Sequence, residues 1–159
     1  SLRGNVDTRI RKVETGEVDA AVLAAAGIIR LGAQEKITEY LPPDRFLPAV
    51  GQGALAVEVR ADDTETLDLV AAITHRPTWL AVAAERAFLR ALGGGCQNPI
   101  GALGTLEGER LALEGLVASV EGDRIFRGRL EGRADDPEAL GTALAHQLMD
   151  QGAAAVLRS

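Results

Sequence analysis

The sequence has little cysteine, few aromatic residues and no long apolar run. One cysteine among 159 residues cannot form an internal disulfide. Aromatic residues make up 3% of the chain, which argues against the base-stacking surface of a single-strand nucleic-acid binder. No run of about 18 apolar residues could span a membrane. Residues 1–8 also lack the basic start and apolar core of a signal peptide, so we expect a cytoplasmic protein without a membrane partner.

The composition that is present belongs to a folded protein. Hydrophobic residues make up 47% of the chain and charged residues 25%, which excludes disorder. At roughly 100–200 residues per domain, the length fits one domain, or one small domain plus part of another. A net charge of -6 argues against a nucleic-acid partner, because affinity for phosphate backbones comes from surplus Lys and Arg. An anionic ligand would therefore need a local basic cluster.

Residues 1–75 have the pattern of an incomplete α/β domain. Asn5 is a favourable N-cap for a first helix. Residues 19–23 form a short apolar run typical of a buried strand, and residues 24–31 suit a second helix. Residues 55–60 alternate like another strand. Parallel partners for such strands are not in this chain, so we expect an N-terminal portion of the protein to be absent or to lie on another polypeptide.

Residues 76–159 have the pattern of a complete α+β domain. A helix with a broad apolar face opens it, and we expect its Trp79 to lie in the core. A last helix begins at Asp135 or Asp136. The two helices could cover the apolar face of an antiparallel three-stranded sheet. Three runs separated by turn residues predict its strands: residues 102–106, 110–117 and 124–131.

Capping and surface roles explain several polar residues. Acidic pairs precede two helix starts, where they suit N-caps, and Thr64 is a further capping residue. His75 and His146 are far apart and have no metal-ligand spacing to the cysteine, so we expect no metal site. The acidic pairs are Asp62-Asp63 and Asp135-Asp136.

A basic cluster surrounds the first helix start. Gly4 lets the backbone approach a ligand, and free amides at a helix N-terminus favour carboxylates or phosphates. Arginine can bind a carboxylate through two parallel hydrogen bonds. The alternative is a solvated helix face paired with Glu14 and Glu17. Local spacing leaves both interpretations open. The cluster consists of Arg3, Arg9, Arg11 and Lys12.

Two glycine-rich segments are candidates for function. Cys96 follows three glycines, so a bulky electrophile could reach its sulfur, although a buried inert thiol is the alternative. The segment Gly51-Gln52-Gly53 lacks the spacing of a phosphate loop and is a candidate chain reversal or hinge.

Short segments across nearly the whole chain follow a specific order and spacing. In that order they resemble the porphobilinogen deaminase family, also called hydroxymethylbilane synthase. The segments are Arg3-Gly4-Asn5-Val6 with Thr8-Arg9, Asp19-Ala20, Leu23-Ala24, Ala26-Gly27, Arg30-Leu31-Gly32, Leu47-Pro48-Ala49-Val50-Gly51-Gln52-Gly53-Ala54, Glu58, Arg60, Ala84-Glu85-Arg86-Ala87-Phe88-Leu89, Gly94-Gly95-Cys96-Gln97 and Pro99-Ile100-Gly101.

The resemblance implies a transferase of tetrapyrrole (porphyrin and heme) biosynthesis. The family joins four porphobilinogen molecules into hydroxymethylbilane, with release of ammonia. The polypyrrole grows on a dipyrromethane cofactor held by a thioether, and the matching residue here is Cys96. Arg3, Arg9 and Arg30 match positions that bind the carboxylates of the cofactor and substrates, and Gln52 matches a position in the segment that links the first two domains.

The resemblance also implies the domain arrangement. The family fold has three domains, of which two are doubly wound α/β units like periplasmic binding proteins. This chain would supply the later part of the second domain and a segment returning to the first, within residues 1–75. Residues 76–159 would be the whole cofactor-bearing third domain. The catalytic aspartate would lie in the N-terminal portion, which is not in this chain, and the whole protein is expected to be a monomer.

A different class of function is the alternative. The chain could act alone as a non-catalytic module that captures a small carboxylate on its arginine cluster. A natural start site just upstream of Ser1 would favour this alternative, whereas an upstream coding sequence for a first domain would favour the enzyme.

Overall fold

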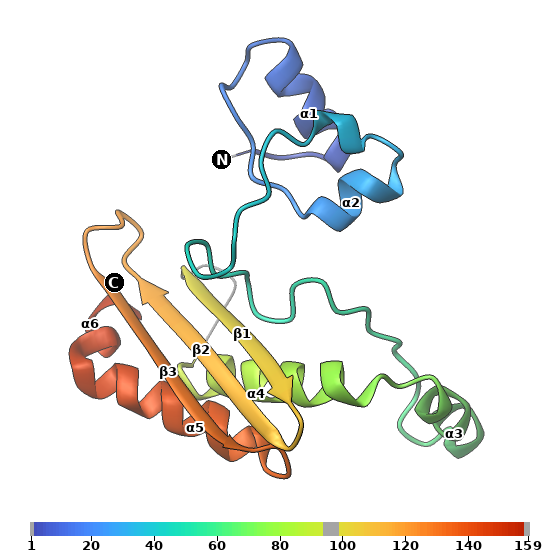
Figure 1. The fold of residues 1–159 in the computed structure, drawn as a ribbon, viewed down its shortest axis with the longest axis vertical. Helices are drawn as coiled ribbons and strands as arrows, with labels where there is room; N and C mark the ends of the chain where they lie inside the picture. The colour runs from blue at the N-terminus through green and yellow to red at the C-terminus, as the bar shows by residue number, and fades with distance from the viewer. Residues whose placement is uncertain (1, 94–98, 158–159) are drawn as a thin grey trace. The chain divides into compact units, whose positions relative to one another are not determined.

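The computed structural model describes residues 2–93 and 99–157. They fall into two compact units, Ser1–Pro42 and Pro43–Ser159, and Figure 1 shows the elements of each. The sequence-based domain boundary after residue 75 stays a prediction.

The first unit contains two short α-helices and one turn of 3-10 helix. They are α1 (Val6–Glu14), α2 (Ala25–Arg30) and η1 (Gln34–Lys36). The helices α1 and α2 are in contact at Gly27, where a Cβ atom would lie 3.5 Å from Val6 Cγ2, an ordinary van der Waals distance. Ile28 is buried in this unit.

The strand expected at residues 19–23 is wrong, because this segment is irregular and joins α1 to α2. Val22, in the middle of the segment, is 62% exposed. A strand needs a neighbour that completes its hydrogen-bond ladder, and no described residue of the chain supplies one here. An apolar run alone therefore does not form a strand.

The second unit contains one sheet and its helices. Its elements are α3 (Thr64–Ala72), α4 (Arg76–Ala91), β1 (Ile100–Glu107), β2 (Arg110–Ala118), β3 (Ile125–Arg133), α5 (Pro137–Leu148), the π-helical turn η2 (Met149–Ala153) and α6 (Ala154–Leu157). The strands pair antiparallel in the order β1-β2-β3. The predicted α+β arrangement of a three-stranded antiparallel sheet with helices is confirmed.

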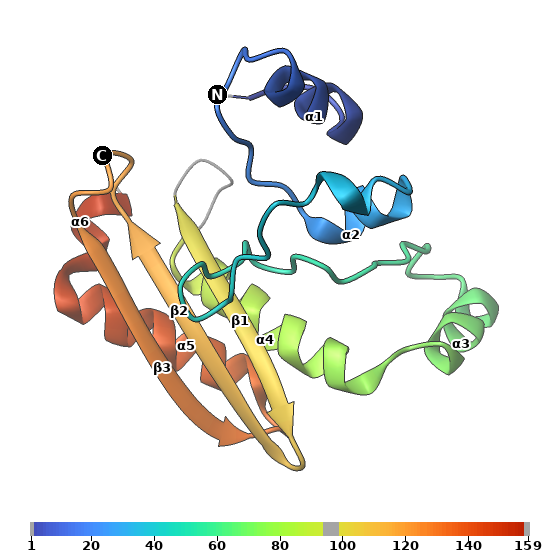
Figure 2. The same cartoon turned by 45° about the horizontal axis from the view of Figure 1, so that its top comes forward.

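The core of the second unit lies between the sheet and two helices. Helices α4 and α5 cover one face of the sheet, as Figure 2 shows. Gly115 of β2 leaves room for a helix side chain, since a Cβ there would lie 2.6 Å from Phe88 Cζ. A Cβ on Gly141 of α5 would collide with the carbonyl oxygen of Ala84. The largest fully buried side chains are Phe88, Leu111, Leu113, Val117, Leu144 and Leu148.

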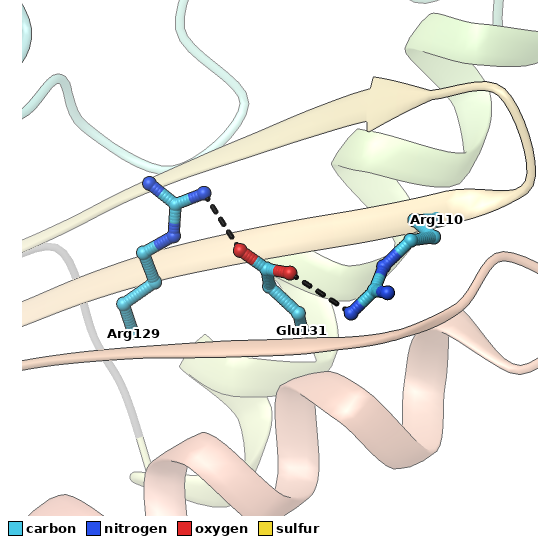
Figure 3. A network of polar contacts seen from close by, with 3 residues as sticks. All are labelled: Arg110, Arg129 and Glu131. Carbon is cyan, nitrogen blue, oxygen red and sulfur yellow. Dashed lines mark hydrogen bonds and ion pairs between the residues drawn. The ribbon is translucent and has the colours of Figure 1, made fainter.

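The opposite face of the sheet carries charged side chains. Glu131 accepts hydrogen bonds from Arg110 (3.1 Å) and from Arg129 (2.9 Å), as Figure 3 shows. Arg127 pairs with Glu114 at 2.6 Å on the same face. Strand alternation explains this face, because successive side chains of β2 and β3 point to opposite sides. Exposed pairs of this kind contribute about 0–1 kcal/mol each.

Two further expectations for the second unit are wrong. Residues 55–60 form no strand, and Leu55 is 90% exposed, because no described strand pairs with this segment. Trp79 is 57% exposed rather than in the core. The burial of α4 begins one residue later, at Leu80, and the N-terminal part of the helix extends past the edge strand β1 (Figures 1 and 2).

Acidic residues cap α3 and α5, as expected. The Asp63 carboxylate accepts from Thr66 N at 3.1 Å, and the Asp136 carboxylate accepts from Ala139 N at 3.0 Å. Asp63, not Thr64, is the N-cap of α3, since Thr64 is already the first helical residue. Asn5 occupies the N-cap of α1, but its side chain makes no capping hydrogen bond.

Candidate functional site

The side chain of Arg9 reaches back over the start of α1 to the backbone of Gly4. Gly4 has φ +113°, a conformation that residues with a side chain rarely adopt. A Cβ atom at Gly4 would also lie 2.9 Å from Thr8 Cγ2. The Arg9 guanidinium Nε donates to the Gly4 carbonyl oxygen at 2.9 Å. This bond leaves the other guanidinium nitrogens of Arg9 for a ligand.

The expected anion-binding arginines share the first unit and keep their charges unneutralised. Within the described part of the chain, no carboxylate lies within ion-pair distance of Arg3, Arg9 or Arg30. Arg3 precedes α1, Arg9 lies in α1, and Arg30 ends α2. Unpaired guanidiniums of this kind suit a ligand with several carboxylates.

The two lysines of this unit differ from Arg3, Arg9 and Arg30. Lys12 pairs with Glu17 at 2.6 Å, and Lys36 pairs with Glu14 at 2.7 Å. The hydrogen bond and the charge of Glu14 raise the pKa of Lys36. Among the described members of the basic cluster, Lys12 alone pairs with a carboxylate, so the interpretation as a paired, solvated helix face holds for Lys12 only.

The segment Gly51-Gln52-Gly53 is the expected chain reversal. Gly51 and Gly53 have φ +72° and +84°, and Gln52 N donates to Ala49 O at 2.9 Å. The bond from Ala54 N to Gly51 O, at 3.3 Å, continues the turn. Both glycines adopt the left-handed conformation that the turn requires, and the Gln52 between them is exposed.

The chain just before this turn lies along the outer edge of β1. Ala102 N donates to Pro48 O at 3.0 Å, and Ala49 forms an isolated antiparallel bridge with Gly101. A Cβ on Gly101 would lie 3.0 Å from Pro48 O, so the glycine permits this approach. The edge strand is thereby joined to residues about 50 positions earlier in the chain.

A buried carboxylate completes the contact between the turn and the sheet. Glu85 of α4 is 5% exposed, its Oε2 accepts from Gly51 N at 2.7 Å, and its Oε1 accepts from Gly104 N at 2.8 Å. Burial raises the pKa of Glu85, and the bonds from Gly104 and Gly51 oppose that shift. Sequence reasoning gave Glu85 no role, although a charged residue between the apolar Ala84 and Ala87 of one helix was a usable signal.

Cys96 and its neighbours 94, 95, 97 and 98 lie outside the described residues. The helix α4 ends at Ala91 and β1 begins at Ile100, on either side of them. The expected role of Cys96 therefore stays a prediction.

Neither a metal-binding cluster nor a membrane-spanning helix occurs among the described residues. Among the residues described, no three His, Cys, Asp or Glu side chains gather in a group that could hold a metal ion. No helix in residues 2–93 or 99–157 has both the length and the apolarity to cross a membrane.

Comparisons with known proteins place both halves of the chain in one family. The family model "Porphobilinogen deaminase, dipyromethane cofactor binding domain" matches residues 1–68, and "Porphobilinogen deaminase, C-terminal domain" matches residues 79–150. A porphobilinogen deaminase of Pelotomaculum thermopropionicum is 54% identical over 158 residues, which cover 99% of this chain and 51% of the relative.

Other relatives of the same name give similar figures. The protein of Desulforudis audaxviator is 53% identical over 156 residues, covering 98% of this chain and 50% of the relative. The protein of Roseiflexus castenholzii is 53% identical over 156 residues, which cover 98% of this chain and 51% of the relative. The chain spans about half the length of the curated relatives it matches.

Proposed function

The chain belongs to the porphobilinogen deaminase family, and we propose that the protein containing it joins four porphobilinogen molecules into hydroxymethylbilane with release of ammonia. The observation that carries this proposal is the match of two models of one family to residues 1–68 and 79–150. The catalytic aspartate of the family has no counterpart assigned in this chain. Catalysis therefore needs the N-terminal portion, and the chain alone is expected to be inactive.

The described residues fit a dipyrromethane cofactor by their charge. The cofactor carries acetate and propionate groups, and Arg3, Arg9 and Arg30, which have no ion-pair partner among the described residues, would bind them. Cys96 would hold the cofactor through a thioether, since a thiolate is a soft nucleophile toward an electron-poor pyrrole methylene. When bound, the cofactor supplies the pyrrole carbon from which the chain grows.

The Gln52 turn would belong to the segment that links the first two domains. Support comes from the two positive-φ glycines that flank Gln52, because such residues allow a sharp change of direction. We place the boundary of the cofactor-bearing domain after residue 75. The preceding residues would complete a periplasmic-binding-protein-like domain only together with the N-terminal portion.

Exposed apolar side chains support this need for another portion. The extended segment 54–60 and the helices after it expose large apolar side chains in the described structure. We infer that the N-terminal portion covers these side chains in the full-length protein. These residues are Leu55, Val57, Leu69, Ile73 and Trp79. The full-length protein would be a cytoplasmic monomer. Analytical sedimentation of the full-length protein tests its oligomeric state.

Intact mass tests the anchoring role of Cys96. The full-length protein should carry one covalent adduct with the mass of a dipyrromethane, and Cys96→Ser should abolish both the adduct and activity. An unmodified Cys96 in active, full-length protein would overturn the thioether. Unmodified, inactive protein would instead favour the stand-alone carboxylate-binding module.

Charge-conserving substitution tests the arginines. Arg9→Lys and Arg30→Lys keep the positive charge but lose the bidentate geometry, so cofactor loading or kcat/KM for porphobilinogen should fall about tenfold or more. Arg110→Lys is the matched control, because Arg110 is an exposed arginine already paired with Glu131 at 3.1 Å. Equal, small effects of all three substitutions would contradict the role of Arg9 and Arg30.

A further inference from the structure

Glu85 joins two segments that are far apart in the sequence. Gly51 lies 34 residues before it and Gly104 lies 19 residues after it, and each donates its backbone N–H to a different oxygen of the carboxylate. In the described part of the chain, no Lys, Arg or His lies within ion-pair distance of Glu85. Two backbone donors are therefore the hydrogen-bond partners that compensate this buried charge.

The outer edge of β1 explains the position of the carboxylate. Ala102 and Gly104 are two residues apart, so both N–H groups point to the same side of the strand. Ala102 N reaches Pro48 O at 3.0 Å, whereas Gly104 N reaches Glu85 Oε1 at 2.8 Å. The carboxylate thus takes the place of the next backbone acceptor along the edge. Its second oxygen accepts from the N–H of Gly51, where the left-handed turn begins.

A helix side chain must also reach this edge without obstruction. A Cβ on Gly104 would lie 2.8 Å from Ala81 Cα, so the glycine lets α4 and β1 approach closely. Only a side chain with two acceptor oxygens satisfies both N–H groups. An amide offers one acceptor and would turn its NH₂ group toward the second donor.

We propose that Glu85 is a positioning residue, which fastens residues 47–51 to the sheet and thereby makes Gln52 and Gly53 the point at which the linking segment pivots. Residues before the turn would then move with the C-terminal sheet, although they precede it by about 50 positions. Any effect of Glu85 on turnover rests on the proposed function. The fastening itself does not depend on it.

Amide hydrogen exchange in the full-length protein tests the fastening. Glu85→Gln should speed exchange at Gly51 and Gly104 at least about tenfold, while amides of β2 such as Leu113 keep their rates. Glu138→Gln is the matched control, because Glu138 is an exposed helix glutamate paired with Arg90 at 3.2 Å. Unchanged exchange at Gly51, or an equal increase in β2, would overturn the proposal.

A measurement on the unsubstituted protein covers the case in which Glu85→Gln does not fold. Since one carboxylate accepts from both amides, the Gly51 and Gly104 amide resonances should shift together on acidification, with one common midpoint. Separate midpoints, or no shift at Gly51, would overturn the fastening.

Turnover separates this inference from the proposed function. If Glu85 positions the linking segment, Glu85→Gln lowers kcat about tenfold and leaves KM for porphobilinogen within about twofold of the value for the unsubstituted protein. Unchanged kcat would overturn that role. Failure of the proposed function would appear differently, as an unsubstituted protein that makes no hydroxymethylbilane while its Gly51 amide stays protected.

Discussion

Single carboxylates fix where several backbone segments begin. Asp63 and Asp136 accept from amides in the first turns of α3 and α5, at 3.1 and 3.0 Å. Glu85 holds amides of a turn and a strand in the same way, at 2.7 and 2.8 Å. The difference is burial, because Asp63 and Asp136 lie near water whereas Glu85 is 5% exposed.

Neighbouring aspartates before α5 give a matched test of capping. Asp136→Ala should lower the free energy of unfolding by about 1 kcal/mol, because the Ala139 amide loses its acceptor. Asp135→Ala removes only an exposed pair with Arg133 and should cost less than about 0.5 kcal/mol. Chemical denaturation of both variants measures the difference, and equal losses would contradict the assignment of Asp136 as the cap.

The two kinds of carboxylate should give opposite dependence of stability on pH. Burial raises the pKa of Glu85, so its favourable contribution is full below the unfolded carboxyl value and is lost as the pH rises through the folded value. The bond from Thr66 lowers the pKa of Asp63, so its contribution is lost as the pH falls. Unfolding at several pH values, comparing the protein with Glu85→Gln and Asp63→Asn, should show slopes of opposite sign.

At the scale of elements, hydrogen-bond partners decide which apolar runs become strands. The runs near residues 100–107, 110–118 and 125–133 are consecutive and separated by tight turns, so each finds its neighbour within the chain. Residues 19–23 and 55–60 have equally suitable patterns but no described partner. Sequence periodicity therefore predicts the three strands of the meander well. It does not predict strands correctly where a strand would need a partner that is distant in the sequence.

The packing of α4 on α5 depends on one glycine. Gly141→Ala should destabilise the protein by roughly 1–3 kcal/mol, because the added methyl group meets the Ala84 carbonyl and lies 2.8 Å from Ala87 Cβ. Ala143→Ser, at an exposed position of the same helix, should change the stability by less than about 0.5 kcal/mol. Thermal unfolding of both variants checks this, and a neutral Gly141→Ala would contradict the close approach.

At the scale of the whole molecule, the sequence predicts more of the fold than of the site. The helices, the meander and the Gln52 turn follow from local pattern. Local pattern does not predict whether Arg3, Arg9 and Arg30 form ion pairs, because that depends on which carboxylates the fold brings near them. Glu85 was missed because its partners are backbone amides of distant residues, which no side-chain motif encodes.

The single tryptophan reports whether the exposed apolar surface is covered in the full-length protein. Trp79 is 57% exposed in this chain. Covering the surface with the N-terminal portion should shift its fluorescence to shorter wavelength and reduce quenching by iodide. A full-length Trp79→Phe variant supplies the background of any other tryptophans. Equal quenching of Trp79 in the chain alone and in the full-length protein would contradict the proposed contact.

The occupied edge of β1 also bears on aggregation. Unpaired N–H groups along an edge strand are a template on which a second molecule can add a strand. Two of these donors, on Ala102 and Gly104, are already bound by Pro48 O and by Glu85. With both donors bound, this stretch of β1 offers a second molecule less of a template for edge-to-edge association, whatever part Glu85 has in turnover.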